Sequence, residues 1–169
     1  MTVYGVWVIN KAGGLIFQRN YGGIKPLTPR SGLLCFLTSV RSLSAHCNEP
    51  VTTISDGIAQ LSANEYLVMA GTLHGVHAIT SRIAPVAKSS GVQIIESESF
   101  KMTIHMTLTG IKFVLISSTD MSNAESVLQK VYEAYADAVM KNPFYTLEMP
   151  INATGFDARM NAIVAASGT

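Results

Sequence analysis

The chain has 169 residues, of which 48% are apolar and 14% are charged, whereas about 25% of the residues in an average soluble domain are charged. Its length predicts a single domain, residues 1–169, with its own core. The net charge of +1, without a basic stripe, excludes a nucleic-acid binder. No apolar stretch approaches the roughly 18 residues that span a bilayer, so no transmembrane segment is expected.

A surface so poor in charge predicts that partner proteins cover part of it. A slightly apolar monomer is the alternative. The amino terminus lacks the basic region of a signal peptide. Cys35 and Cys47 are too few for a disulfide framework and fit a reducing cytosol.

The first elements predict a β-hairpin. Residues 3–9 (VYGVWVI) are almost continuously apolar, which is typical of a central strand covered on both faces. Residues 10–14 form a glycine-bearing turn, and residues 15–19 return as a second strand. The turn does not fit a phosphate-binding loop, because it lacks the Gly-Lys-Ser/Thr ending and a strand follows it. Residues 22–60 then carry three of the six prolines and no sustained period, which predicts an irregular insertion.

A helix is expected to begin after Ser62, because Ser62 and Glu65 have the spacing of a capping box. It should run to about Ile83 and end before Pro85. Its broad apolar face is predicted to contain Tyr66, Met69, Ala70, Leu73, Val76 and Ile83.

The same helix carries a strip of small residues, Gly71, Gly75 and Ala78. Each glycine inside a helix costs about 1 kcal/mol relative to alanine. The strip therefore predicts the close approach of another backbone, which is either the sheet of this domain or a second chain. His74 and His77 have the i, i+3 spacing of a metal pair, but no third ligand is fixed nearby, so packing or surface histidines are favoured.

Residues 92–98 predict a third strand. Residues 100–108 alternate apolar and polar side chains, which is typical of a half-buried fourth strand, and residues 111–116 return as a fifth. Ser122 and Glu125 predict a second capping box and a long helix that ends at Lys141, Asn142 and Pro143. A short helix over residues 154–166 closes the chain.

The predicted fold is therefore α+β, with the order ββαβββα and a short C-terminal helix. Five mostly antiparallel strands pack with two long helices. Residues 144–151, which Pro143 and Pro150 bracket, are expected either to fasten the helix end to the sheet or to offer an anchor to a partner.

No catalytic group is predicted. No serine lies in a G-x-S-x-G elbow, His105 lies among threonines without an acidic partner, and the acidic residues mainly occupy helix caps and faces. The expectation is a protein that is not an enzyme, without a cofactor or a metal.

Four stretches resemble the sybindin family: residues 10–16 (NKAGGLI), 64–67 (NEYL), 107–113 (TLTGIKF) and 141–151 (KNPFYTLEMPI). The resemblance covers roughly residues 1–20 and 60–160. Residues 22–60 depart from it and are too short for the PDZ-like module that some members carry there.

The resemblance implies a longin-type fold in a core subunit of the TRAPP vesicle-tethering complex. Such a subunit is cytoplasmic and peripheral at cis-Golgi and ER-to-Golgi membranes. It pairs with a second longin subunit and with acylated α/β subunits, and the assembly acts as a guanine-nucleotide exchange factor for a Ypt/Rab-family GTPase. We place the GTPase- or partner-binding surface at Lys141, Asn142, Phe144, Tyr145, Glu148 and Met149, and subunit packing at Gly71, Gly75 and Ala78.

Three other interpretations remain. The chain is alternatively a purely architectural longin subunit without GTPase contact. A longin domain of a SNARE or adaptor is weaker, because no SNARE heptads, membrane anchor or lipidation motif follow. A hydrolase is the weakest, and turnover of generic esters would test it.

Overall fold

The computed structural model describes residues 2–21, 61–85, 89–146 and 148–167. The predicted insertion at residues 22–60, with both cysteines, lies outside the described residues. The sheet is antiparallel throughout, in the order β2-β1-β5-β4-β3. Its strands are β1 (Val3–Ile9), β2 (Leu15–Asn20), β3 (Ile94–Glu96), β4 (Lys101–Met106) and β5 (Lys112–Ser117).

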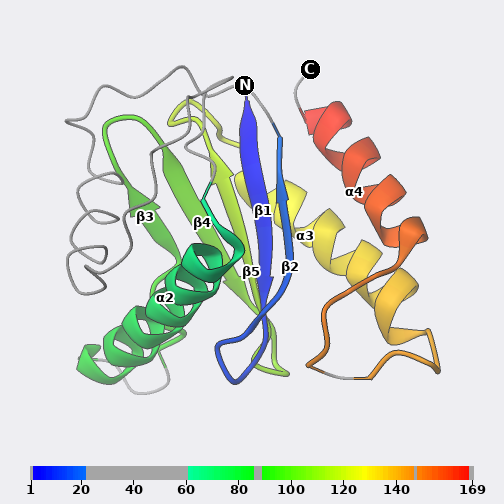
Figure 1. Ribbon diagram of the computed structural model, residues 1–169. Coiled ribbons are helices and arrows are strands. Elements are labelled where there is room, and N and C mark those ends of the chain that lie inside the picture. The colour runs from blue at the N-terminus through cyan, green and yellow to red at the C-terminus, as the bar shows by residue number, and fades with distance from the viewer. Residues whose placement is uncertain (1, 22–60, 86–88, 147, 168–169) are drawn as a thin grey trace, which may run out of the picture.

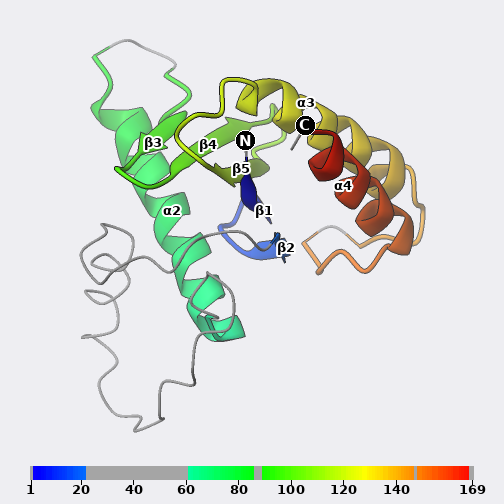
Figure 2. The ribbon, with the colours of Figure 1, turned by 90° about the horizontal axis from the view of Figure 1, so that it is seen from above.

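Helices cover both faces of this sheet (Figures 1 and 2). Helix α2 (Ala63–Ile83) lies on one face. Helix α3 (Ala124–Tyr135), its π-helical continuation η2 (Ala136–Met140) and helix α4 (Thr154–Ser167) lie on the other. The predicted α+β fold, with the order ββαβββα and a C-terminal helix, is confirmed.

The two faces have separate cores because successive residues of a strand point to opposite sides. Val8 of β1 and Phe113 of β5 pack with α3 and α4. Trp7 and Val114, their neighbours in the same strands, pack with α2. Both central strands are therefore apolar on both faces, as predicted for β1.

The prediction of a half-buried fourth strand is wrong. Thr103 lies on its polar side and is nevertheless buried, because α3 covers that face. Leu108, predicted to be part of the apolar face, lies in the turn after β4 and is fully exposed. The third strand is also shorter than predicted, three residues in place of seven.

The capping box of α2 is confirmed. The Ser62 amide donates to Glu65 Oε2 at 2.7 Å, and the Glu65 amide donates to Ser62 Oγ at 3.4 Å. The helix ends at Ile83, two residues before Pro85, as predicted.

The second predicted capping box is wrong. The N-cap of α3 is Asn123, whose side chain makes no capping hydrogen bond. The helix begins one residue later than predicted, so Glu125 occupies the second helical position, where the reciprocal capping-box geometry does not form. Met121 and Ala124, both buried, hold the chain in this register.

Candidate functional site

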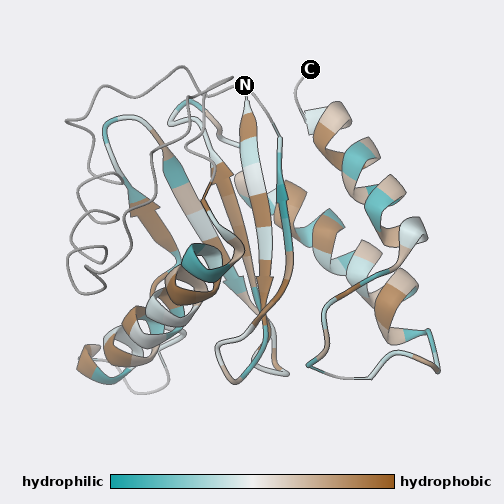
Figure 3. Cartoon of the chain, viewed as in Figure 1, coloured by the Kyte–Doolittle hydropathy of each residue, from teal (hydrophilic) through white to brown (hydrophobic). Residues whose placement is uncertain are grey.

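The side of α2 that is turned away from the sheet carries several exposed apolar residues, and the helix shows brown bands between white and teal ones in Figure 3. We call this side the α2 outer face. Its large exposed residues are Leu67, Val68, Val76, Ile79 and Ile83. Val76 and Ile83 were predicted to share one broad apolar face with Tyr66, Met69, Ala70 and Leu73, but both are exposed whereas the other four are buried. The buried stripe runs through Tyr66, Met69, Ala70, Leu73 and His77, which leaves Val76 and Ile83 on its flank.

The predicted packing strip of small residues lies within the α2 outer face. Gly71 and Ala78 are exposed and Gly75 is half-buried. A Cβ atom added at Gly71 or Gly75 would meet no described atom within 4 Å. The sheet of this domain therefore does not approach these glycines, and packing against a second chain stays a prediction.

The predicted GTPase- or partner-binding residues lie together in the turn after η2, which we call the 141–149 segment. Phe144 is 92% exposed and Met149 is 58% exposed. Asn142 Oδ1 accepts a hydrogen bond from the Phe144 amide at 3.1 Å, which holds the turn. Lys141 pairs with Asp137, one helical turn earlier. The segment thus presents two apolar side chains next to a helix end.

Other residues of the same region fasten it to the domain. Tyr145 packs partly buried against the core, and its hydroxyl donates to the Met149 carbonyl at 2.8 Å. The Ile151 amide donates to the Ile16 carbonyl of β2 at 2.8 Å. Glu148 has a positive φ of 76° and lies 3.9 Å from Lys11 Nζ. The alternative that residues 144–151 fasten the helix end to the sheet is therefore confirmed for Tyr145 and Ile151, and the anchor for a partner stays a prediction.

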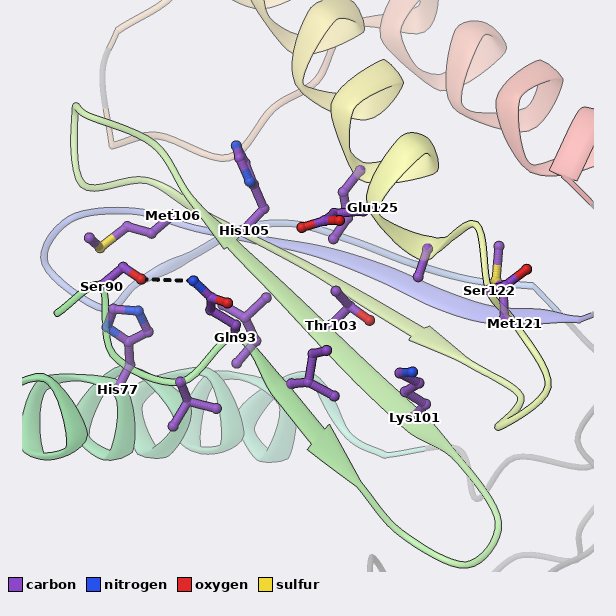
Figure 4. Close-up of a pocket in the computed structure, with 15 residues that line it drawn as sticks. His77, Ser90, Gln93, Lys101, Thr103, His105, Met106, Met121, Ser122 and Glu125 are labelled. Atoms are coloured by element: carbon purple, nitrogen blue, oxygen red, sulfur yellow. Dashed lines mark hydrogen bonds between the residues drawn. The ribbon is translucent and has the colours of Figure 1, made fainter. Parts of the chain in front are cut away.

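A cavity of about 280 Å³ lies around the edge of β4, between α2 and the start of α3 (Figure 4). His77, Gln93, Thr103, His105 and Glu125 line it, among others. Thr103 Oγ1 and His77 Nε2 are buried without a hydrogen-bond partner. Sequence reasoning missed that Glu125 joins His105 here, because it assigned Glu125 to a cap. No hydrogen bond links the two within the described residues, so the cavity does not show a catalytic pair.

A buried lysine lies at the end of the sheet where the β1–β2 and β4–β5 turns meet (Figure 1). Lys112 opens β5, is 5% exposed and points to the α2 side. Its Nζ lies 3.2 Å from His74 Nδ1 and donates to the Gly110 carbonyl at 3.3 Å. Sequence reasoning did not single out Lys112, although a lysine at the start of a buried strand was a visible signal.

Burial lowers the pKa of Lys112. Burial, and then the nearby Lys112 ammonium, lowers the pKa of His74. Burial, and then the Lys112 ammonium, also lower the pKa of His77, whereas a hydrogen bond to the backbone of Ser90 raises it and nearby His74 lowers it further. Both histidines pack against the domain, and the described residues contain no group of three metal-ligating side chains. None of the helices described here combines the length and apolarity needed to cross a membrane.

These features define a longin-like α+β domain that exposes apolar side chains on α2 and in the 141–149 segment. The chain belongs to the Sybindin-like family, which matches residues 3–167. The resemblance found in the sequence is thus confirmed.

The relatives extend over nearly the whole chain. Trafficking protein particle complex subunit 4 of Dictyostelium discoideum is 34% identical over 165 residues, which cover 97% of each chain. The Homo sapiens protein of that name is 32% identical over 203 residues, covering 95% of this chain and 92% of its own. Trafficking protein particle complex subunit 1 of Bos taurus is 28% identical over 101 residues, covering 59% of this chain and 70% of its own.

Proposed function

We propose that this chain is a core subunit of the TRAPP vesicle-tethering complex. The observation that carries the proposal is the similarity to proteins named as subunit 4 of the trafficking protein particle complex, which extends over 97% of both chains in the Dictyostelium case. The exposed apolar residues of the α2 outer face and the 141–149 segment support it, because a component of an assembly buries such surface against its partners.

Within the complex the chain supports guanine-nucleotide exchange on a Ypt/Rab-family GTPase during ER-to-Golgi transport. It acts at cis-Golgi and ER-to-Golgi membranes as a peripheral component. The assembly favours exchange because it binds the nucleotide-free GTPase more tightly than the nucleotide-bound form. This chain contributes docking surface, and no acid, base or cofactor of its own is needed.

The α2 outer face is the proposed contact with a second longin subunit. Gly71, Gly75 and Ala78 form a strip without bulky side chains along the helix, between the exposed Val68 and Ile79. A partner helix approaches most closely where side chains are smallest, so the strip sets where the two chains meet. The acylated α/β subunits take other surfaces.

The 141–149 segment is the proposed contact with the GTPase. Phe144 and Met149 form its apolar centre, and Lys141, Asn142 and Glu148 form a polar rim around them. Tyr145 acts differently, because its half-buried ring and its bond to Met149 hold the segment in shape. An apolar anchor with a polar rim is the usual arrangement of an interface.

Phe144→Ala tests this contact in a complex assembled from this chain and its longin partner. We expect capture of nucleotide-free GTPase to weaken and exchange to slow by about tenfold, the effect of losing an aromatic anchor. The subunits should still co-purify, because Phe144 is exposed and contributes little to the fold. Ile94→Ala, which truncates an exposed residue at the far edge of the sheet, is the matched control.

The second candidate is a purely architectural longin subunit. The contacts of Tyr145 and Ile151 with this chain's own domain favour it, because they give the segment a structural role. In that case Phe144→Ala leaves exchange unchanged, and Tyr145→Ala reduces assembly instead.

A further inference from the structure

Among the described residues, no acidic side chain forms an ion pair with the buried ammonium of Lys112. The side chain is 5% exposed, and its two partners, the Gly110 carbonyl and His74 Nδ1, are both uncharged. An ammonium has three donors and no acceptor, so His74 Nδ1 must accept and one Nζ proton has no partner among the described residues. Buried charges in proteins are normally paired, because an uncompensated charge loses its hydration without gaining a partner.

The surroundings of Lys112 add positive charge rather than negative. Burial lowers the pKa of Lys112, and no carboxylate of the described residues acts against that shift. Lys11 lies beside Gly110, since a Cβ atom at Gly110 would be 3.2 Å from Lys11 Cβ. Glu148 Oε1 lies 3.9 Å from Lys11 Nζ, and no hydrogen bond or ion pair among the described residues joins Glu148 to Lys112 or His74. Within the part of the chain that the structure describes, Lys11 and Lys112 therefore outnumber the one acid, Glu148, at this end of the sheet.

The same end also carries exposed apolar side chains. Met106 lies directly across from Lys112 in the β4–β5 pair and is 40% exposed. Leu108, in the turn that follows, is fully exposed. Exposed apolar side chains that lie together are a feature of surfaces that bind a partner.

We infer that Lys112, with His74, is the docking point for a carboxylate side chain, Asp or Glu, of a partner subunit. The inference rests on the proposed function, because it requires an assembly. A carboxylate there would take the free Nζ proton in a charge-assisted hydrogen bond. The apolar part of the partner chain would cover Met106 and Leu108.

Lys112→Met tests the inference because it has opposite effects on the chain and on the assembly. In the full chain, kept dilute, the melting temperature should stay equal or rise, since an apolar side chain of similar length replaces an unpaired buried charge. Capture of the co-purifying subunits should weaken by about tenfold or more, since their carboxylate loses its partner. Lys130→Met, on the exposed side of α3, should change neither.

A zero-length carbodiimide cross-link in the assembled complex identifies the acid. The inference expects Lys112 to be joined to an Asp or Glu of a co-purified subunit. A cross-link to an acid of this same chain, or equal capture by wild type and Lys112→Met, overturns it while leaving the proposed function intact. If the wild-type chain captures no subunit at all, the proposed function itself fails.

Discussion

At the scale of single residues, sequence reasoning singled out the histidines of α2 but not the lysine that lies beside them. His74 and His77 were predicted as packing or surface residues, and both pack against the domain. Lys112 lowers the pKa values of both histidines in addition to burial. It is 38 residues from His74 in sequence, and the two side chains come into contact only in the folded chain. Helical spacing places the two histidines near one face, but it carries no information about a strand that crosses beneath them.

These histidines predict a loss of stability on acidification. Their pKa values in the folded chain lie below the ordinary 6.5, so the unfolded chain binds more protons as the pH falls. The contribution of the two neutral histidines to the free energy of unfolding is therefore complete above pH 6.5. It is lost as the pH falls through their lowered pKa values in the folded chain. Urea unfolding of the full chain between pH 7.5 and pH 5 measures it.

Lys112→Met provides the matched comparison for this pH dependence. It removes the like charge but not the burial, so the loss between pH 7.5 and pH 5 should become smaller without vanishing. His77→Gln should remove the part of this stability loss that comes from protonation of His77. Stability that rises toward pH 5 in the wild type would show that the histidines charge without cost.

At the scale of elements, the two helix starts show what a local motif can and cannot predict. Ser62 and Glu65 form the predicted capping box, whereas Ser122 and Glu125, at the same spacing, do not. The difference comes from tertiary packing, because buried Met121 sets the register of the second helix. The motif specifies which hydrogen bonds are available, and the core decides which residue becomes the cap.

The paired substitutions Ser62→Ala and Ser122→Ala test that distinction. Ser62→Ala should lower the free energy of unfolding by about 1 kcal/mol, because it leaves an amide at the start of α2 without its acceptor. Ser122→Ala should cost less than half as much. Denaturant titration of both variants measures the two changes in the free energy of unfolding. Equal losses would mean that the second capping box does form.

The α2 outer face predicts a contrast between the isolated chain and the assembly. Gly71→Ala should stabilise the full chain by roughly 0.5–1 kcal/mol, because the helix interior gains a better helix former and the new Cβ meets no described atom. Gly75→Leu should leave the isolated chain folded. It should prevent assembly, because the leucine side chain would occupy the space where a partner helix packs against the small residues of α2. Thermal unfolding and co-purification measure the two effects, with Lys130→Leu as the control.

At the scale of the whole molecule, the order of elements and the antiparallel sheet were predictable because period-two and period-3.6 patterns are local. The burial of both faces of β4 could not be predicted in this way. Thr103 is a polar residue, and it is buried only because α3 packs over it. The cavity around β4 and the Lys112 site likewise combine residues from α2, β4, β5 and α3. The 141–149 segment was predicted as one surface, but the structure divides it into exposed Phe144 and fastened Tyr145.

The same account predicts the behaviour of the chain when it is produced alone. A domain with an exposed apolar helix face and few charges should be poorly soluble, and co-expression with its partner subunits should rescue it. Sedimentation of the purified chain measures this. A well-behaved monomer at high concentration would show that the apolar surface needs no cover.

The most direct test of the central claim, that this chain functions as a subunit through its surfaces, is affinity capture of the tagged chain from its native cells. The co-purifying proteins are then identified and their stoichiometry is measured. We predict a complex of fixed composition that contains a second longin subunit, and its loss in Gly75→Leu. Recovery of the wild-type chain as a monomer, without any stoichiometric partner, would contradict the account.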